Sequence, residues 1–411
     1  MQGINGHKAG YKHTTLGWIP EDWEVKKLSE CIIAKGDYGI NAAAVDYSTE
    51  LPAYLRITDI DDDGNFCRDK KKSVADINYE QFILQDGDIV FVRTGATVGK
   101  TYLYDRSDGQ LVFAGFLIRF KTDSQILLPY YLKLYTLTKP YWDWVKTTCT
   151  RSGQPGINST EYGQFKLPVP KQFEQHKIVK VISTWDEAIQ RMQQLIVQIK
   201  RRNKGLMQQL MSGTIRLKGF KEKWKDLKLA NVTTKISRRN GDLVDAKVYS
   251  VTNSNGFVLQ SEHFEREIAG ADLSNYKIIK KHEFAYNPAR INVGSIAYFT
   301  EEIGIISSLY VCFKTNSNLL DMYLRYLLDL GHTKHKIESL GEGGVRIYLW
   351  YDLFAQIRIA LPPIEEQEAI MKILVSADNE LKLYEKHLAN LQQLKKGLMQ
   401  KLLSGEVRVK V

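Results

Sequence analysis

The stretch Lys204-Gly205-Leu206-Met207-Gln208-Gln209-Leu210-Met211-Ser212-Gly213-Thr214-Ile215-Arg216 returns as Lys396-Gly397-Leu398-Met399-Gln400-Lys401-Leu402-Leu403-Ser404-Gly405-Glu406-Val407-Arg408. Nine of these thirteen positions are identical. Around them, residues 170–217 align without a gap onto residues 362–409, at a constant offset of 192. A repeat of this kind indicates that one structural unit is present twice. The duplication therefore organises the whole chain.

Each copy of the repeat carries an apolar seam with heptad spacing. In the first copy the seam contains Ile178, Ile182, Trp185, Ile189, Met192, Ile196, Ile199, Leu206 and Leu210, and in the second Ile370, Leu374, Ala377, Leu381, Tyr384, Leu388, Leu391, Leu398 and Leu402. Alternating steps of four and three residues are typical of coiled-coil packing. Asn203 and Lys395 interrupt the seam at the same position. A polar residue there can fix the register of the helices, and fraying near the helix end is the alternative.

The length of the repeat predicts a strut. A helix from His176 to Met211 would be roughly 54 Å long at about 1.5 Å per residue. Pro170 and Pro362 precede the two helices and Ser-Gly ends them, as helix start and stop signals do. We expect the two helices to pack antiparallel on each other, with neighbouring chain termini. The alternative is that each helix buries its seam in a separate domain.

The rest of the chain predicts two globular domains rich in strands. We place the first domain at residues 1–169, the first helix at 170–217, the second domain at 218–361 and the second helix at 362–411. Expected strands are Asp88 to Arg93, Leu111 to Lys121, Ser295 to Phe299 and Ile305 to Lys314, and expected helices are Pro129 to Lys146 and Asp321 to Leu330. Faint matches, such as Phe120-Lys121-Thr122 with Phe313-Lys314-Thr315, indicate one fold with two diverged surfaces. The predicted fold class is α+β.

The composition favours a polyanionic partner. The chain has 57 Lys and Arg against 47 Asp and Glu, a net charge of +10. Such a surface suits nucleic acid, although a solubilising charge excess is the simpler alternative. The four Cys lack metal-binding or redox spacing and suggest a reducing cytoplasm. Neither a signal peptide nor a membrane-spanning run is present, so we expect no membrane association.

Two stretches resemble catalytic motifs but lack essential parts. The turn from Gly95 to Thr101 has three residues between its glycines where a P-loop needs four, and a strand-like segment follows it. The tetrapeptide Asn287-Pro288-Ala289-Arg290 lacks the aromatic residue that would stack on a flipped base. We therefore expect neither a catalytic nor a metal site in this chain. These two turns instead present Arg93, Thr94, Lys100 and Arg290.

Arg, Lys and Gln in flexible segments are the candidate DNA-binding residues. Arg pairs with guanine and Gln with adenine, whereas lysine runs more often meet phosphates. The candidates are Arg68, Lys70, Lys71, Lys72, Arg93, Thr94, Lys100, Arg151, Gln154, Lys235, Arg238, Arg239, Arg290 and Arg346. For any one of them a solvated surface position is the alternative.

The order of these segments resembles the specificity subunit of bacterial Type I restriction–modification systems. The matching residues are Leu167, Pro168, Pro170, Glu174 and Gln175, with Leu361, Pro362, Pro363, Glu366 and Gln367 in the second copy. Gly17-Trp18-Ile19-Pro20 and Asp86-Gly87-Asp88-Ile89-Val90 are similar to the family's recognition domains. Lys281 to Arg290 departs from the latter pattern, so we do not expect equivalent DNA contacts there.

The resemblance implies a noncatalytic subunit that reads double-stranded DNA. Each domain would be a target-recognition domain for one half of a bipartite, asymmetric site, with the helices setting the spacer in a pseudo-twofold, nearly circular arrangement. The helices would also dock two adenine-methyltransferase subunits, and restriction–translocase subunits would join the complex. S-adenosylmethionine, ATP and Mg²⁺ would bind to those partners and not to this chain. A coiled-coil adaptor without DNA specificity, or a self-sufficient methyltransferase or nuclease with unrecognised motifs, are the alternatives.

Overall fold

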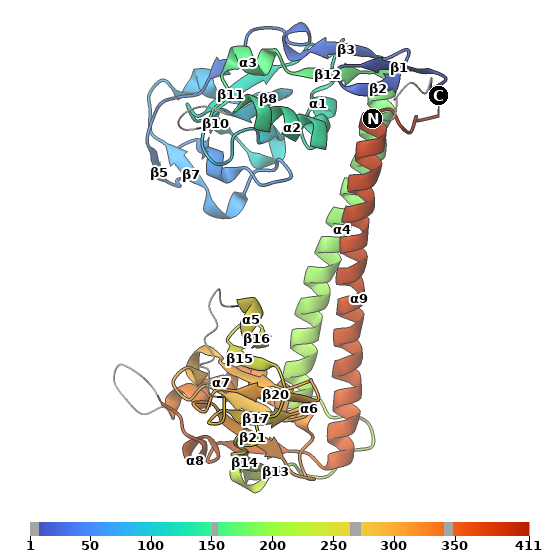
Figure 1. Ribbon diagram of the computed structural model, residues 1–411. Helices are drawn as coiled ribbons and strands as arrows, with labels where there is room; N and C mark the ends of the chain where they lie inside the picture. Colours follow the sequence, from blue (N-terminus) through green and yellow to red (C-terminus); the bar gives the residue numbers. More distant parts are fainter. Residues whose placement is uncertain (1–7, 150–154, 264–272, 341–347, 411) are drawn as a thin grey trace. The chain divides into compact units, whose positions relative to one another are not determined.

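The structure is a computed structural model that describes residues 8–149, 155–263, 273–340 and 348–410. The chain divides into two compact units. The first contains Met1–Gln193 and Lys386–Val411, and the second contains Gln194–Glu385. Each unit combines one globular domain with a part of each of two 40-residue helices, α4 (Gln172–Met211) and α9 (Ile364–Leu403), which are labelled in Figure 1.

The globular part of the first unit consists of short strands and helices. The strands are β1 (Tyr11–Thr14), β2 (Gly17–Pro20), β3 (Glu24–Lys27), β4 (Asp37–Tyr38), β5 (Ala44–Asp46), β6 (Ala53–Leu55), β7 (Lys72–Val74), β8 (Asp88–Val92), β9 (Thr101–Leu103), β10 (Leu111–Phe113), β11 (Leu117–Lys121) and β12 (Lys166–Val169). The helices are α1 (Pro129–Tyr135), α2 (Lys139–Thr148) and α3 (Ser159–Gly163), with 3-10 turns η1 (Leu28–Glu30), η2 (Ile57–Asp59), η3 (Arg68–Lys70), η4 (Tyr79–Phe82) and η5 (Arg106–Asp108).

Strand β8 lies at the centre of the first unit. It belongs to the antiparallel sheet β4-β11-β8-β9, beside a second sheet in the order β10-β6-β7-β5. All five residues of β8 are buried, because successive side chains point to opposite faces and both faces are covered. Ile89 and Phe91 pack into the core that holds α1 and α2, whereas Val90 and Val92 pack with residues of the second sheet.

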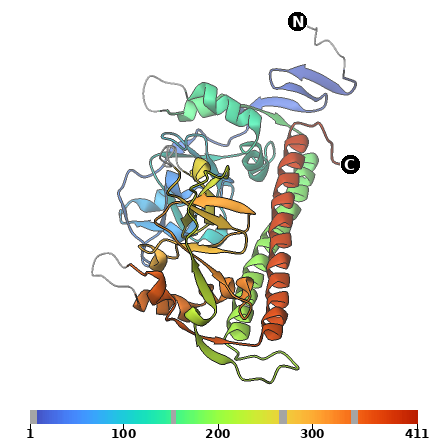
Figure 2. The same ribbon diagram turned by 60° about the horizontal axis from the view of Figure 1, so that its bottom comes forward.

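The second unit has a corresponding set of elements. The strands are β13 (Lys225–Lys228), β14 (Thr233–Ile236), β15 (Val248–Thr252), β16 (Gly256–Leu259), β17 (Lys277–Lys280), β18 (Phe284–Tyr286), β19 (Ile296–Tyr298), β20 (Ile303–Ile306), β21 (Val311–Thr315) and β22 (Arg358–Leu361). The helices are α5 (Gln260–His263), α6 (Asp321–Asp329), α7 (Gly331–Ser339) and α8 (Tyr351–Phe354), with 3-10 turns η6 (Leu229–Asn231) and η7 (Ile291–Val293). Figure 2 shows the same elements in a second view.

The two domains share one fold. The sheet β14-β21-β18-β19 has the same strand order as β4-β11-β8-β9. The second sheet contains a parallel pair in each unit, β10 with β6 and β15 with β20, but its edges differ. In the first unit β5 extends the sheet beyond β7, whereas in the second β17 pairs with β20. This confirms the prediction of one fold with two diverged surfaces.

The turn before β8 and the turn before β18 keep one backbone geometry despite different sequences. Gly87 and His282 both have left-handed backbones, with φ of +83° and +70°. In each turn the next residue accepts a hydrogen bond from a backbone N–H, Asp88 from Gln85 at 2.8 Å and Glu283 from Lys280 at 2.9 Å. The sequence departure that begins at Lys281 therefore leaves the geometry of this turn unchanged.

Four sequence-based segment predictions need correction. The expected helix from Pro129 to Lys146 is two helices, because Pro140 cannot donate to the carbonyl of Thr136 and instead occupies the first turn of α2. Leu111 to Lys121 and Ile305 to Lys314 each form two strands that belong to different sheets. The first long helix begins at Gln172, not at His176.

Helices α4 and α9 run antiparallel within each unit. In the second unit Lys200 pairs with Glu385 at 2.8 Å, Arg202 with Glu380 at 2.6 Å, and Asn203 donates to the carbonyl of Ala377 at 2.9 Å. In this series the α4 residue numbers rise while the α9 numbers fall. Figures 1 and 2 both show α4 beside α9 within each unit. The predicted antiparallel pairing is confirmed.

The seam has two environments. Near the domains it is buried: Ile178 and Ile182 join the core of the first unit, and Ile370 and Leu374 join that of the second. Further along the helices, Trp185, Ile189, Leu381 and Leu388 are half-buried. Each helix end is therefore part of a domain core, as the alternative interpretation expected, while the remaining seam packs helix against helix.

The polar seam residues have partners, which excludes fraying. Lys395 forms a 2.5 Å ion pair with Asp186, whose other oxygen accepts from the Tyr130 hydroxyl at 3.2 Å. In the second unit Asn203 binds the carbonyl of Ala377, and the neighbouring Asp378 accepts from Tyr326. Residues 186 and 378 are equivalent in the repeat, so the same acidic position joins helix to domain twice.

A buried carboxylate near the start of each long helix ties three segments together. Glu366 is fully buried and accepts two bonds from Arg216, at 2.7 and 2.8 Å, and one from the Trp224 indole at 3.0 Å. Glu174 has the same partners in Arg408, at 2.5 and 2.8 Å, and Trp23, at 3.0 Å. We call these two clusters the Glu–Arg–Trp joints.

The first joint brings residues near both chain ends together. Arg408 also binds Asp22 through two 3.0 Å bonds, and the Tyr11 hydroxyl donates to the carbonyl of Gly405 at 2.8 Å. Neighbouring termini are thus confirmed for the described residues. The bond to Arg408 lowers the pKa of Asp22.

Arg216→Met should lower the free energy of unfolding of the second unit by about 3 kcal/mol, because it leaves the buried Glu366 carboxylate without a cation. Urea denaturation followed by tryptophan fluorescence measures the change. Arg191→Met is the matched control, since Arg191 pairs with Glu187 at 3.5 Å on an open helix face. It should cost less than about 0.5 kcal/mol. Equal losses in both variants would contradict the role assigned to the joint.

Candidate nucleic-acid interface

The basic run after β6 divides into paired and unpaired charges. The Arg68 guanidinium donates to Asp108 at 2.7 Å and to Ser107 at 2.9 Å, and Lys72 pairs with Asp46 at 2.6 Å. Lys70 is exposed and has no side-chain partner among the described residues, whereas Lys71 lies 5.7 Å from the ring centre of Tyr47. Lys70 and Lys71 are therefore the more available cations of this run.

The turn between β8 and β9 is held by its own unit. Gly95 and Gly99 have left-handed backbones, and the strand β9 follows, as expected for a turn that is not a P-loop. Lys100 donates to the carbonyl of Ile60 at 3.2 Å and pairs with Asp62 at 2.7 Å. Its charge is thus opposed within the chain, and Lys100 stays a prediction as a DNA contact.

Arg93 and Thr94 lie at the start of the same turn. The Arg93 guanidinium carbon lies over the exposed ring of Tyr38, 4.7 Å from its centre. The Thr94 hydroxyl donates to the carbonyl of Pro155 at 3.3 Å. A guanidinium placed over an aromatic ring keeps its charge and its N–H donors, which suits a contact to a base edge or a phosphate.

The second unit gathers positive charge at the edge formed by β14 and β17. Lys235 and Arg239 are exposed, and a β-bridge joins Arg239 to Lys277. Burial lowers the pKa of Lys277, and the charges of Lys235 and Arg239 lower it further. Arg238 is instead paired with Glu283. Lys277 is not among the candidates predicted from sequence, because only strand pairing brings it beside residues about 40 positions earlier.

Arg290 lies in a turn equivalent to that of Arg93 and Lys100. In the first turn the N–H of Val98 donates to Gly95 at 3.2 Å, and in the second Val293 donates to Arg290 at 3.2 Å. Gly99 and Gly294 close the two turns with φ near +90°. The Arg290 side chain is exposed and has no partner among the described residues. The candidates Arg151, Gln154 and Arg346 lie outside the described residues.

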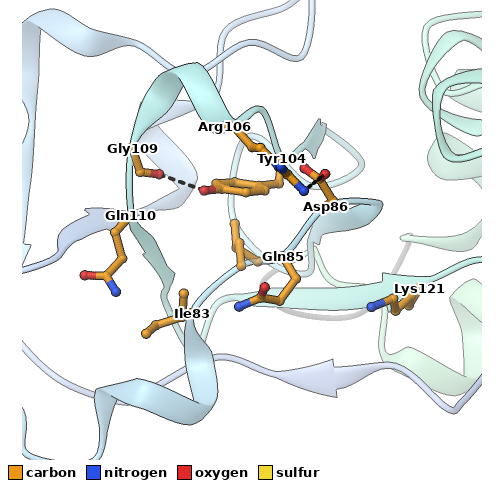
Figure 3. A pocket seen from close by; sticks show the side chains of 9 residues that line it. Ile83, Gln85, Asp86, Tyr104, Arg106, Gly109, Gln110 and Lys121 are labelled. Carbon is orange, nitrogen blue, oxygen red and sulfur yellow. Dashed lines mark hydrogen bonds and ion pairs between the residues drawn. The ribbon is translucent and has the colours of Figure 1, made fainter.

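A cavity of about 590 Å³ in the first unit carries polar groups that the sequence analysis did not select. Figure 3 shows Gln85 and Gln110 at this cavity, with Lys121 at one side. The Gln85 and Gln110 amides have no side-chain hydrogen bond within the described ranges, whereas Tyr104 donates to the Gly109 carbonyl at 3.0 Å. The two amides come from separate loops, so no local motif marks them. Each can pair with adenine.

Two features of the described residues bear on other classes of function. No group of three or more His, Cys, Asp or Glu side chains in the described ranges is arranged to hold a metal ion. In the same part of the chain, no helix combines the length and the hydropathy that a membrane span needs.

The comparisons with known proteins identify the family. Residues 20–201 and 221–393 match the family described as the Type I restriction modification DNA specificity domain. The chain therefore belongs to this family, with two copies of its domain. It is a DNA-specificity subunit of the Type I restriction–modification class, a component that recognises the DNA target and does not itself catalyse a reaction.

Two curated relatives come from Methanocaldococcus jannaschii. The putative type I restriction enzyme MjaX specificity subunit is 28% identical over 97% of both chains. The type I restriction enzyme MjaVIII specificity subunit is 25% identical, over 95% of this chain and 94% of the relative. Because nearly the full length of each protein is covered, the likeness extends to the order of domains and helices.

Solved structures share the fold at lower identity. A chain from work on complex assembly and conformational transition of a type I R-M system aligns with a TM-score of 0.59 and 15% identity, covering 95% of this chain and 99% of that one. The HsdS subunit from Thermoanaerobacter tengcongensis aligns with a TM-score of 0.52 and 15% identity, covering 95% and 98%. The predicted α+β architecture is confirmed.

K235A/R239A should weaken binding to duplex DNA of any sequence and should reduce the slope of log affinity against log salt concentration by about two, because two phosphate contacts are lost. Fluorescence anisotropy of the assembled complex over a salt series measures the slope. Arg68→Ala is the control, since Asp108 already opposes that charge, and it should change the slope by less than about one. An unchanged slope in the double variant would show that the edge formed by β14 and β17 does not contact DNA.

Proposed function

We propose that each domain reads one half of a bipartite, asymmetric DNA target and that α4 and α9 set the number of base pairs between the halves. The observation that carries this proposal is the repeated construction. Two domains of one fold are joined to two 40-residue helices through the same Glu–Arg–Trp joints, yet their sheet edges and charged loops differ. Two domains that are attached to the helices in the same way but have different surfaces are suited to recognising two different DNA sequences.

The length of the helices supports a spacing role. A 40-residue helix is about 60 Å long at 1.5 Å per residue. Half-sites that lie on one face of B-DNA are separated by about 34 Å or its multiples. A helix pair with polar register positions at Asn203 and Lys395 resists sliding, because sliding would bury these groups without partners. A fixed register is what a spacer needs.

The partners that we propose are two adenine-methyltransferase subunits, with restriction–translocase subunits in the larger complex. Methyl transfer from S-adenosylmethionine and ATP- and Mg²⁺-dependent cleavage would take place on those subunits. Val197, Leu383 and Leu394 are 65%, 68% and 59% exposed although they lie on the long helices. A partner subunit that packs along the long helices would cover these apolar side chains.

Cells that contain this chain with its methyltransferase partner should carry modified adenines in a two-part motif with an undefined spacer. Sequencing of modified bases measures the motif. A continuous or palindromic motif would contradict two different readers. Methyl incorporation by the isolated chain, incubated with DNA and labelled S-adenosylmethionine, would instead support a self-sufficient enzyme.

Deleting one heptad from each helix, residues 190–196 and 382–388, should shorten the spacer by about three base pairs and leave both half-sites unchanged. Seven residues correspond to about 10.5 Å of helix, and one base pair to about 3.4 Å. The contacts of Lys395 and Asn203 keep their register when both helices are shortened. The single deletion of residues 190–196 is the control. It separates Asn203 from Ala377 and should abolish modification. An unchanged spacer after the double deletion would exclude the spacing role.

A further inference from the structure

The second unit contains a cleft with no counterpart among the assigned sites. Its volume is about 740 Å³, and it lies between the β15–β16 turn, the η7 turn and helices α6 and α7. The β15–β16 turn contributes Asn253 and Asn255, and the η7 turn contributes Asn292. The two turns pack against each other, since a Cβ on Gly294 would lie 3.6 Å from the carbonyl oxygen of Asn253. All of its lining residues belong to the second unit.

In the first unit, chain fills the corresponding space. The long connection from β6 to β7 packs against the turn between β8 and β9, where Thr97 donates to the carbonyl of Ile57 at 3.5 Å and Lys100 to that of Ile60 at 3.2 Å. A Cβ on Gly64 would lie 2.7 Å from the Thr101 carbonyl oxygen, so the packing is close. In the second unit only residues 253–255 join β15 to β16. The cleft is open because this connection is short.

The three asparagines are available for a ligand. Their side-chain amides have no hydrogen-bond partner among the described residues, and Asn253 and Asn255 are exposed. An Asn amide offers one acceptor and two donors, the pattern that pairs with the N6 and N7 edge of adenine in the major groove. Three amides of the same chemistry in one cleft favour one kind of base.

The interior of the cleft is apolar, and its rim carries charge. Phe257, Ile296 and Tyr298 line the cleft and are half-buried. Contact with such a surface suits the C5-methyl group of thymine, which lies beside adenine in the major groove. Arg325 lines the rim and has no ion-pair partner among the described residues, while Lys334 pairs with Asp329 at 3.2 Å. Arg325 can meet a phosphate.

We propose that this cleft is the base-reading site of the second domain and that Asn253, Asn255 and Asn292 select A·T pairs in its half-site. This inference rests on the proposed function, because it assigns the residues of one of the two readers. The first domain must read its half-site with another surface, since its β6–β7 connection occupies the equivalent space.

The test is base-modification sequencing in cells that contain the full chain and its methyltransferase partner. Asn253→Ala, Asn255→Ala and Asn292→Ala, made singly, should each relax an A·T position in one half-site while the other half-site and the spacer stay unchanged. A lost bidentate contact corresponds to roughly 5- to 150-fold weaker discrimination at that position. Asn318→Ala is the matched control. It removes an exposed amide of the second unit outside the cleft and should leave the motif unchanged.

The outcomes separate this inference from the proposed function. A wild-type motif without two parts overturns the proposed function itself. A two-part wild-type motif that all three variants retain overturns only the assignment of the cleft. If a variant abolishes modification, the purified complex is compared on duplexes with single A·T pairs of the motif replaced. Equal loss of affinity for all duplexes then overturns base reading, whereas loss of discrimination at one A·T pair supports it.

Discussion

A buried carboxylate near the start of each long helix is the constraint on which the rest of the structure depends. Glu174 and Glu366 are almost fully removed from solvent, and a buried charge is tolerated only when cations and hydrogen-bond donors surround it. The donors come from two other segments: an indole directly before β3 or β13, and an arginine beyond the end of the opposite helix. Helix, domain and tail therefore form one cooperative assembly at each joint. Gln175 and Gln367 extend it, each bridging two backbone carbonyls and one N–H.

Antiparallel packing explains why the seam can contain polar residues. Lys395 and Asn203 occupy the same position of the repeat, but one meets the Asp186 carboxylate and the other a backbone carbonyl. Both contacts lie where a domain tyrosine reaches the adjacent helix. A shift of either helix by one turn would therefore break contacts with the other helix and with the domain. The polar interruptions define the register, at some cost in seam hydrophobicity.

The sequence predicts the repeated helices well because heptad spacing is a local property, and residues such as Ile182 and Leu374 reveal it directly. It also marks Glu174, Glu366, Arg216 and Arg408 as repeated charges, although it does not show that they meet, since Arg408 lies 234 positions from Glu174. The candidate interface is less predictable. From sequence, Lys100 is predicted to be an unpaired cation, but it forms an ion pair with Asp62. Lys277 is brought beside Arg239 by a β-bridge, which the sequence does not reveal. The cleft lined by Asn253 and Asn292 is open because the connection between β15 and β16 is short. A short connection carries no sequence motif that could have predicted the cleft.

The identical joints have an evolutionary consequence. Lys204 to Arg216 and Lys396 to Arg408 share nine of thirteen residues, so two coding segments specify similar peptides. Recombination between such segments would replace one domain without altering the residues that attach it, because Arg216 and Arg408 serve equivalent carboxylates. The helices would already supply the buried carboxylate that binds the tryptophan of a new domain, and the polar residues that fix the helix register. The repeated joints would thus let one DNA-reading domain be exchanged for another in a single genetic step.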